Sequence, residues 1–493
     1  MKKLALAVAV PLVLIGAATF YTSTQVEPNA RNAVDEANVK LRELSVGAGA
    51  DVSITMLSFD DGGLLASDAR YQVDIAVPDE DGGTRQYALL VQDRIEHGPF
   101  PLSRVTRGRL MPVAAQSHFQ LERSPLTETL FDAASGQSPL AGEVAIGYDG
   151  SQHGELRSVA LNLEDSDGSV RVSPATIAFE AAKNATAVRL DGKLPDIDLN
   201  LLGAEGKPVR MSVRGVGMTA DKKQDDNGFA LGPSGLVVKR MEIQVGDEPA
   251  VVIQNATVDE RLSQGSQGID QTVAYRVGRL DAQGQTFSNL ALAFSLRHLE
   301  QTSLKALLDS YKAVLASDAD PEAALANMTS EQLGDLQAKG MQLLAQKPTL
   351  ALDEFGFETA HGAARLSVVI DLNSPSTEAF TPDAMIASML GSLKAEAGVD
   401  KGLVRDLTGL MAQRELDGAD TDPVALQQQA DASAELFSAM AIDTGWFQLQ
   451  GDRLASSLHY TDDKVTLNGR AMSVQEFIGF AFGSVQGAGL LGR

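Results

Sequence analysis

The sequence predicts a β-dominated α+β protein: a long, curled antiparallel sheet with helical insertions, preceded by one N-terminal transmembrane helix. Three observations lead to this prediction. The stretch Leu4–Phe20 carries no charged residue. Long stretches between Asp51 and Leu296 alternate apolar and polar residues with period two, which is typical of strands with one buried face. Several later stretches repeat their apolar residues at helical spacing instead.

The N-terminal stretch is long enough to serve as a membrane anchor. Lys2 and Lys3 precede Leu4–Phe20, whose length is near the lower end of the roughly 17 to 25 residues that cross a bilayer. Lysines stay on the cytoplasmic side, so we expect an uncleaved signal-anchor over residues 1–22 of a bacterial inner-membrane protein, with the body in the periplasm. The alternative is a signal peptide cleaved near Ala18, which would release a soluble periplasmic protein.

A tether and a β-rich body follow the anchor. Within residues 23–47, Pro28–Leu44 has helical spacing and predicts a tether helix. Residues 48–298 form the predicted β-rich periplasmic body, in which Tyr71, Val73, Ile75 and Val77 show the period-two pattern. Turn sequences such as Asn-Gly and Asp-Gly separate the strands. Many of these strands are longer than the usual five or six residues, which favours a meandering, strongly twisted sheet.

Helices dominate the next part of the chain. Residues 299–347 form a predicted helical insertion, with one helix over Leu304–Leu315 and another that opens with a capping box at Thr329. Residues 348–493 form a mixed β/α part that continues the same body. Its predicted helices cover Thr381–Ala397, Lys401–Arg414, Pro423–Ala441 and Val474–Phe482.

The most distinctive motif is His97-Gly98-Pro99-Phe100-Pro101-Leu102. Neither proline can donate a ladder hydrogen bond, so a strand must end here or run along an edge. Phe100 stands between two rigid residues and suits an anchor for a core or a partner. The motif favours a structural corner. A functional role for His97, which titrates near neutral pH, is the alternative.

Composition excludes several kinds of function. The 41 Lys and Arg residues against 65 Asp and Glu give a net charge of −24, which argues against nucleic acid or anionic headgroups as major partners. The chain has no cysteine, which removes disulfides, thiolate metal sites and a Cys nucleophile. No nucleophile elbow, phosphate loop or metal-binding histidine pair is present. Aspartate-rich turns invite a calcium interpretation, but turn chemistry explains them. We therefore expect no enzyme activity, cofactor or metal.

The motif and its surroundings resemble the YdgA-like family of Gram-negative bacteria, inner-membrane-anchored periplasmic proteins with a domain of unknown function. The resemblance spans nearly the whole chain and implies a location and an architecture, but no catalytic residues. Beyond the anchor and His97–Leu102, it rests on Leu130-Phe131-Asp132, Ile146-Gly147-Tyr148, Leu467-Asn468-Gly469, Met472 and Glu476-Phe477.

Three functional hypotheses remain. The first is a non-enzymatic envelope protein whose sheet binds lipid acyl chains or an extended partner segment in an apolar groove. Its candidate groove wall is Leu290, Leu292, Phe294 and Leu296, although core packing explains the same row. The second is a self-associating assembly factor for envelope proteins, with Leu304–Leu315 and Thr381–Ala397 as contacts. The third is a periplasmic hydrolase, which would need a base and a nucleophile brought together by the fold.

Overall fold

The computed structural model describes two compact units of the chain. Unit 1 is residues 1–248 with 308–336, and unit 2 is residues 249–307 with 337–493. The described residues are Val34, Asp35, Asn38 and Leu41, followed by 51–60, 62–78, 84–165, 168–203, 206–315, 321–374, 388–415 and 423–487.

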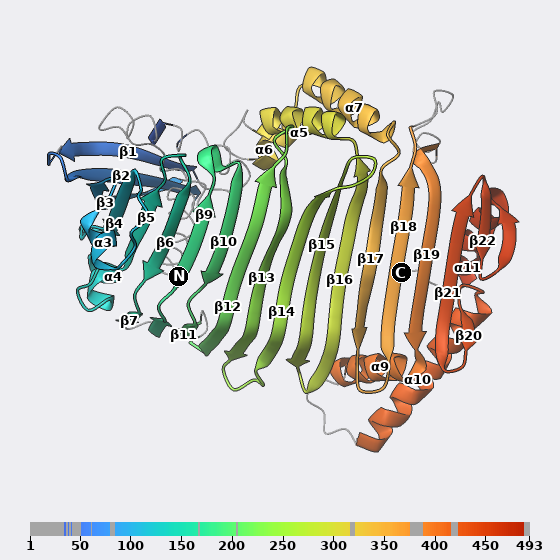
Figure 1. The fold of residues 1–493 in the computed structure, drawn as a ribbon. Helices are drawn as coiled ribbons and strands as arrows, with labels where there is room; N and C mark the ends of the chain where they lie inside the picture. The colour runs from blue at the N-terminus through green and yellow to red at the C-terminus, as the bar shows by residue number, and fades with distance from the viewer. Residues whose placement is uncertain are drawn as a thin grey trace. The chain divides into compact units, whose positions relative to one another are not determined.

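Unit 1 begins as a simple antiparallel meander in which each strand pairs with the next (Figure 1). Its connections carry helix α3 (Leu102–Thr106) between β3 and β4 and helix α4 (Glu128–Ala133) between β4 and β5. The strands are β1 (Asp51–Asp60), β2 (Ala66–Pro78), β3 (Thr84–His97), β4 (Ala115–Leu121), β5 (Leu140–Ile146) and β6 (Gln152–Ser158).

The meander of unit 1 then continues in strands that are broken in two. β9 pairs with β6 and β10, whereas β8 pairs with β7 and β11. The long β12 pairs with both β10 and β11 on one side and with β13 on the other. These elements are β7 (Leu161–Asp165), β8 (Gly168–Val172), β9 (Thr176–Ala181), the short 3-10 helix η1 (Lys183–Ala185), β10 (Ala187–Lys193), β11 (Ile197–Leu202), β12 (Pro208–Gln224) and β13 (Ala230–Val245).

The core of unit 1 is the apolar face of this sheet. Along β2, the side chains of Tyr71, Val73 and Ile75 are buried, as the alternation predicts. The described residues of the predicted tether helix are helical, and Leu41 packs into the same core. The Asn38 amide holds this helix to β1, because it both donates to the carbonyl oxygen of Ile54 at 2.8 Å and accepts from the N–H of Ile54 at 2.7 Å.

Unit 2 is a second antiparallel meander, in which β14 to β19 pair in chain order. β21 pairs with β19 on one side and with β20 and β22 on the other, and β22 pairs with β23. The strands are β14 (Val251–Gln264), β15 (Ile269–Ala282), β16 (Gln285–Leu299), β17 (Thr349–Glu358), β18 (Ala363–Leu372), β19 (Leu390–Asp400), β20 (Gln448–Gln450), β21 (Arg453–Thr461), β22 (Lys464–Leu467) and β23 (Arg470–Ser473).

Helices occupy three places in the chain after β16. Between β16 and β17 lie α5 (Gln301–Leu315), α6 (Pro321–Ala326) and α7 (Ser330–Leu344). α9 (Lys401–Glu415) and α10 (Pro423–Asp443) follow β19 and pack together, with the Thr408 hydroxyl donating to the carbonyl oxygen of Ala430 at 3.0 Å. The last helix, α11 (Val474–Gly487), brings Phe477 and Phe480 against Trp446.

The predicted β-dominated class and the long antiparallel strands are confirmed, and β12 is the longest with 17 residues. The helix predicted over Thr381–Ala397 is wrong from Leu390 onward, because Leu390–Asp400 is strand β19. Its Leu393, Ala395 and Ala397 alternate with Lys394 and Glu396, and pairing with β18 and β21 outweighs the helix propensity of Leu and Ala.

The predicted N-terminal membrane helix and the cleavage site near Ala18 lie outside the described residues. Within the part of the chain that the structure describes, no helix is both long enough and apolar enough to cross a membrane.

Candidate functional site

The motif at His97–Leu102 ends β3 and begins a segment whose side chains contact one face of the sheet of unit 1. We call Gly98–Ala114, which includes α3, the α3 segment. At its base the N–H of Gly98 donates to the carbonyl oxygen of Ala114 at 2.8 Å. A Cβ atom at position 98 would lie 2.0 Å from the carbonyl oxygen of Val113, so only glycine fits there. The predicted end of a strand at the motif is therefore confirmed, and the two chain passes are held closely together.

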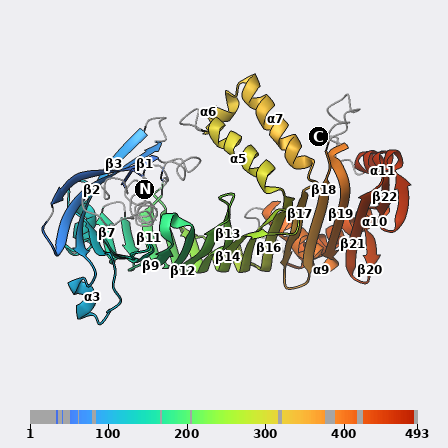
Figure 2. The same ribbon diagram turned by 45° about the horizontal axis from the view of Figure 1, so that its top comes forward.

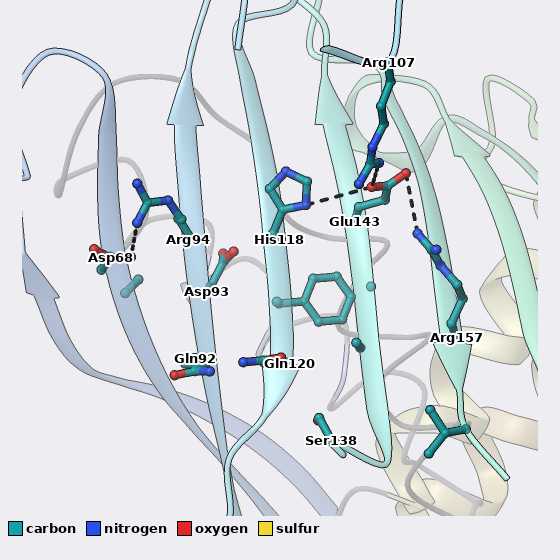
Figure 3. A pocket seen from close by; sticks show the side chains of 15 residues that line it. Asp68, Gln92, Asp93, Arg94, Arg107, His118, Gln120, Ser138, Glu143 and Arg157 are labelled. Carbon is teal, nitrogen blue, oxygen red and sulfur yellow. Dashed lines mark hydrogen bonds and ion pairs between the residues drawn. The ribbon is translucent and has the colours of Figure 1, made fainter. Parts of the chain in front are cut away.

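A row of charged and titratable side chains runs across five strands beneath this segment. The sheet register places Asp68 opposite Arg94, Arg94 opposite His118, His118 opposite Glu143 and Glu143 opposite Glu155. Residues directly opposite one another in neighbouring strands share a face, so all five side chains project from the same face of the sheet. Figure 3 shows four of them, with an ion pair joining Asp68 to Arg94 and a contact of 3.8 Å between His118 and Glu143.

Polar contacts fasten the α3 segment to this face. The carboxylate of Glu96, at the end of β3, accepts hydrogen bonds from the N–H of Ser103 at 3.0 Å and from its hydroxyl at 2.6 Å. The guanidinium of Arg104 donates to the side-chain oxygen of the buried Gln116 at 3.2 Å. Because no side chain of helix α3 itself is buried, these polar contacts fix the position of the helix.

Glu143 is the centre of the cluster. It is buried, and its carboxylate is 2.5 Å from Arg107, 3.4 Å from Arg109 and 3.6 Å from Arg157. Burial raises the pKa of Glu143, but the hydrogen bond from Arg107 and the charges of Arg107, Arg157 and Arg109 outweigh it, so the pKa lies below its usual value. The carboxylate is therefore ionised at neutral pH, and it holds two arginines of the α3 segment to the sheet.

An open pocket of about 720 Å³ lies along this row, lined by residues of β2 to β6 and by Arg107 (Figure 3). Beside it, the Ser103 hydroxyl oxygen is 3.0 Å from Nε2 of His118, and Nδ1 of His118 is 3.8 Å from Glu143. This set resembles the nucleophile, base and acid of a hydrolase. However, the Ser103 proton is directed to Glu96, so His118 must donate to Ser103 rather than accept from it.

The structure separates the predicted motif residues from this cluster. Nε2 of His97 lies 3.0 Å from the hydroxyl of the buried Ser67, away from Ser103. Phe100 is exposed and does not anchor the core. Ser103, His118 and Glu143 were not predicted, because they come from three separate segments and only the register brings them together. Among the described residues, no group of histidine, aspartate and glutamate could hold a metal ion.

The predicted groove wall lies in unit 2 and belongs to a much larger apolar surface. Leu290, Leu292, Phe294 and Leu296 all lie in β16, where Leu292 is opposite Tyr275 of β15 and Phe355 of β17. We call this side of β15–β18 the apolar face. Its members, which follow from the register, are Val273, Tyr275, Val277, Leu290, Leu292, Phe294, Leu296, Leu350, Leu352, Phe355, Leu366, Val368 and Ile370.

The apolar face is not closed over like a core. Leu292, Phe294, Leu350, Phe355 and Tyr275 remain between 38% and 44% exposed. The Tyr275 and Phe294 rings lie 6.1 Å apart, so adjacent strands contribute to one aromatic surface. Leu290 and Leu296 are half-buried. The four residues of the predicted wall therefore lie on the same face of the sheet, and Leu292 and Phe294 remain accessible.

The opposite side of the same strands is polar. Arg276 of β15 pairs with Asp259 of β14 at 3.7 Å, and Lys394 pairs with Glu396 within β19 at 2.9 Å. Asp371 of β18 accepts from the hydroxyls of Ser392 and Thr349, at 2.6 Å each, and these two hydrogen bonds lower its pKa. A sheet with one polar face normally buries the other. Here the apolar side retains accessible large side chains, which marks it as a candidate binding surface.

Comparison with known proteins gives a family match. A family model described as "Bacterial protein of unknown function (DUF945)" matches residues 1–475. Among curated proteins, the Escherichia coli K12 protein named Protein YdgA is 21% identical over 481 residues, covering 96% of this chain and 94% of its own length. Uncharacterized protein YihF of the same strain is 23% identical over 500 residues, covering 97% and 98%. No solved structure matches. Because the family model covers almost the entire chain, the protein belongs to this family of bacterial proteins of unknown function, as its resemblance to YdgA-like proteins predicted.

Proposed function

We propose that the chain is a cell-envelope protein that binds phospholipid acyl chains on the apolar face of unit 2. The single observation that supports this proposal is the accessible row formed by Tyr275, Leu292 and Phe355 across three adjacent strands. Each of these side chains would lose apolar surface to a bound chain, which is favourable by about 25 cal/mol per Å². An acyl chain in contact with several of them would be held without any specific polar group.

The hydrogen bonding of the sheet favours an acyl chain over an extended peptide. β15, β16, β17 and β18 are each paired on both sides, so their backbone groups are already used in the ladders. A peptide lying on this face would leave its own N–H and C=O groups without partners, at a cost of about 1–3 kcal/mol for each buried group. An acyl chain has no such groups.

We further propose that the protein is anchored in the bacterial inner membrane by Leu4–Phe20, with both units in the periplasm. The basic pair Lys2 and Lys3 before an uncharged apolar stretch supports this orientation. A protein held at a membrane has a steady supply of phospholipid, so the two proposals are consistent with each other.

Native mass spectrometry of the full-length protein in detergent tests the binding proposal. Phospholipid should remain bound after detergent exchange to the unaltered chain. Tyr275→Gln and Leu292→Gln should lower the bound fraction severalfold, because each places an amide on the apolar face. Arg276→Gln is the matched control, since it adds the same amide to the neighbouring residue on the opposite face. A bare dimer without lipid would contradict the proposal and support a self-associating assembly factor.

One observation keeps a hydrolase as the second candidate. Ser103, His118 and Glu143 approach one another beside an open pocket, although the Ser103 proton is directed to Glu96. A fluorophosphonate probe that labels the unaltered protein but not Ser103→Ala would support this candidate. Absence of labelling across the pH range in which the protein stays folded would leave the cluster with a structural role.

A further inference from the structure

Seven of the eight described large apolar side chains of unit 1 that are at least 58% exposed gather at one end of its first strands; the eighth is Leu202 at the end of β11. The seven come from three connections: β1 to β2, β3 to β4, and β5 to β6. The side chains, between 58% and 94% exposed, are Leu64, Leu65, Phe100, Leu102, Leu110, Met111 and Tyr148. We call these seven residues the apolar tips.

Hydrogen bonds show that the three connections are neighbours. The N–H of His97 donates to the carbonyl oxygen of Leu65 at 2.9 Å, which joins the first connection to the start of the second. The N–H of Ala114 donates to the carbonyl oxygen of Ile146 at 2.7 Å, which joins the end of the second to the third. Figure 2 shows α3 projecting from the strands of unit 1. The apolar tips therefore share one end of the sheet.

The other end of the same strands is built differently. The connection from β4 to β5 also carries apolar residues, but Leu130, Phe131 and Ala134 are buried there. Arg123 covers the Phe131 ring, with its guanidinium carbon 5.5 Å from the ring centre. Large apolar side chains are thus far more exposed at the α3 end than at the opposite end, where Leu126 is 39% exposed. Several adjacent residues of this kind mark an interaction surface.

The α3 segment is basic, in contrast to the chain as a whole, while the two neighbouring connections add Asp61 and Asp149. Between His97 and Ala114 the sequence holds Arg104, Arg107 and Arg109 and no acidic residue, in a chain of net charge −24. Arg107 and Arg109 contact Glu143 yet remain about half exposed, at 51% and 56% of their side-chain surface. Arginines beside exposed apolar side chains are the combination that binds an anionic membrane interface.

We propose that the apolar tips and the arginines of the α3 segment dock onto the surface of a bilayer that contains anionic phospholipid. Apolar side chains on three separate connections can each enter the headgroup region, while arginines bind lipid phosphates at the same depth. The acidic remainder of the chain is repelled by such a surface, so the contact centres on the α3 segment with its three arginines.

Site-specific labelling of the full-length protein tests this contact, since the chain contains no cysteine of its own. An environment-sensitive dye is attached to the new cysteine of Met111→Cys. The control protein carries the same dye on Gln137→Cys, which lies in the β4–β5 connection at the opposite end of the strands. On vesicles of phosphatidylethanolamine and phosphatidylglycerol, the dye at position 111 should shift to shorter wavelength and be quenched by nitroxide-labelled lipid. The dye at position 137 should do neither.

A second variant tests whether the three connections act together. Leu110→Glu combined with Met111→Glu should reduce quenching of a dye at Leu64→Cys severalfold, whereas Leu126→Glu at the opposite end should not change it. A vesicle-bound chain whose dye at position 111 remains in water would overturn the proposal, because the N-terminal stretch alone would then hold the protein on the vesicle. A wavelength shift without lipid quenching would also overturn it, and would indicate contact with a second copy. Quenching of the same extent on vesicles of phosphatidylcholine alone would contradict the proposed binding of anionic lipid by the arginines.

Discussion

The carboxylate of Asp196 accepts a hydrogen bond from the backbone N–H of Gly215 at 2.7 Å, at a point where neighbouring strands of unit 1 are interrupted. Asp196 lies between β10 and β11, and Gly215 is left out of the ladder between β12 and β13, which keeps one register on both sides of it. A similar side-chain hydrogen bond occurs at the break between β8 and β9, where the Ser173 hydroxyl accepts from the N–H of Asp196 at 2.8 Å. The breaks therefore form a line across the sheet in which side chains replace missing ladder bonds.

Asp196→Ala should destabilise unit 1 by about 1–2 kcal/mol, because it leaves the N–H of Gly215 without its partner. The measurement is urea unfolding followed by circular dichroism. Asp198→Ala is the control two residues away, since the Asp198 carboxylate is half exposed and forms an ion pair with the partly exposed Arg214. That substitution should cost less than about 1 kcal/mol. Equal losses of unfolding free energy in the two variants would show that the hydrogen bond from Gly215 to Asp196 contributes no more to stability than a surface ion pair.

Glu143→Gln should destabilise unit 1 by about 1–3 kcal/mol at pH 7, because it removes the carboxylate that three arginines share. The pKa of Glu143 is lower in the folded protein than in the unfolded chain. Its contribution is therefore complete above the unfolded pKa of about 4.3 and is lost as the pH falls through the lower folded pKa. The difference in unfolding free energy between the two proteins should shrink below pH 4. A difference that stayed constant down to pH 3 would contradict this assignment.

Glu300 should cap α5, since its carboxylate accepts from the N–H groups of Thr302 at 2.9 Å and Ser303 at 2.7 Å. These hydrogen bonds lower the pKa of Glu300 to about 2. Glu300→Ala should cost about 1 kcal/mol at neutral pH, and the loss should vanish as the pH falls from the unfolded value toward 2. Chemical-shift titration of the Glu300 carboxyl carbon measures the pKa directly. A midpoint near 4.5 would show that the cap does not form.

Trp446 is the only tryptophan of the chain, so its fluorescence reports on the aromatic cluster of unit 2. Its ring centre lies 5.8 Å from that of Phe477 and 5.3 Å from that of Phe480, both on α11. Phe480→Ala should shift the emission to longer wavelength, because water reaches the indole. Ile478→Ala on the same helix is the control, since Ile478 is about half exposed. An unchanged spectrum in Phe480→Ala would place the helix elsewhere.

Period-two alternation predicted most of the sheet, because strands with one polar and one apolar face repeat every second residue. It also predicted that Leu290, Leu292, Phe294 and Leu296 share a face. The sequence could not predict that Leu292 meets Tyr275 and Phe355, because cross-strand register depends on turns and on interruptions such as the one between Ser288 and Ala291.

The cluster around Glu143 was beyond prediction for the same reason. His118 and Glu143 become neighbours only through the register of β4 with β5, and Ser103 joins them through the fold of the α3 segment. The strand β19 was mistaken for a helix because its Leu and Ala residues favour helices, whereas two neighbouring strands decide its conformation.

The central claim is that acyl chains lie on the apolar face of unit 2, and site-specific crosslinking in cells tests it most directly. A photoreactive benzoylphenylalanine replaces Tyr275 in one protein and Arg276 in another, two adjacent residues of β15 on opposite faces. We predict a covalent phospholipid adduct from position 275 and none from position 276. Adducts of equal yield at both positions, or protein adducts alone from position 275, would contradict the account.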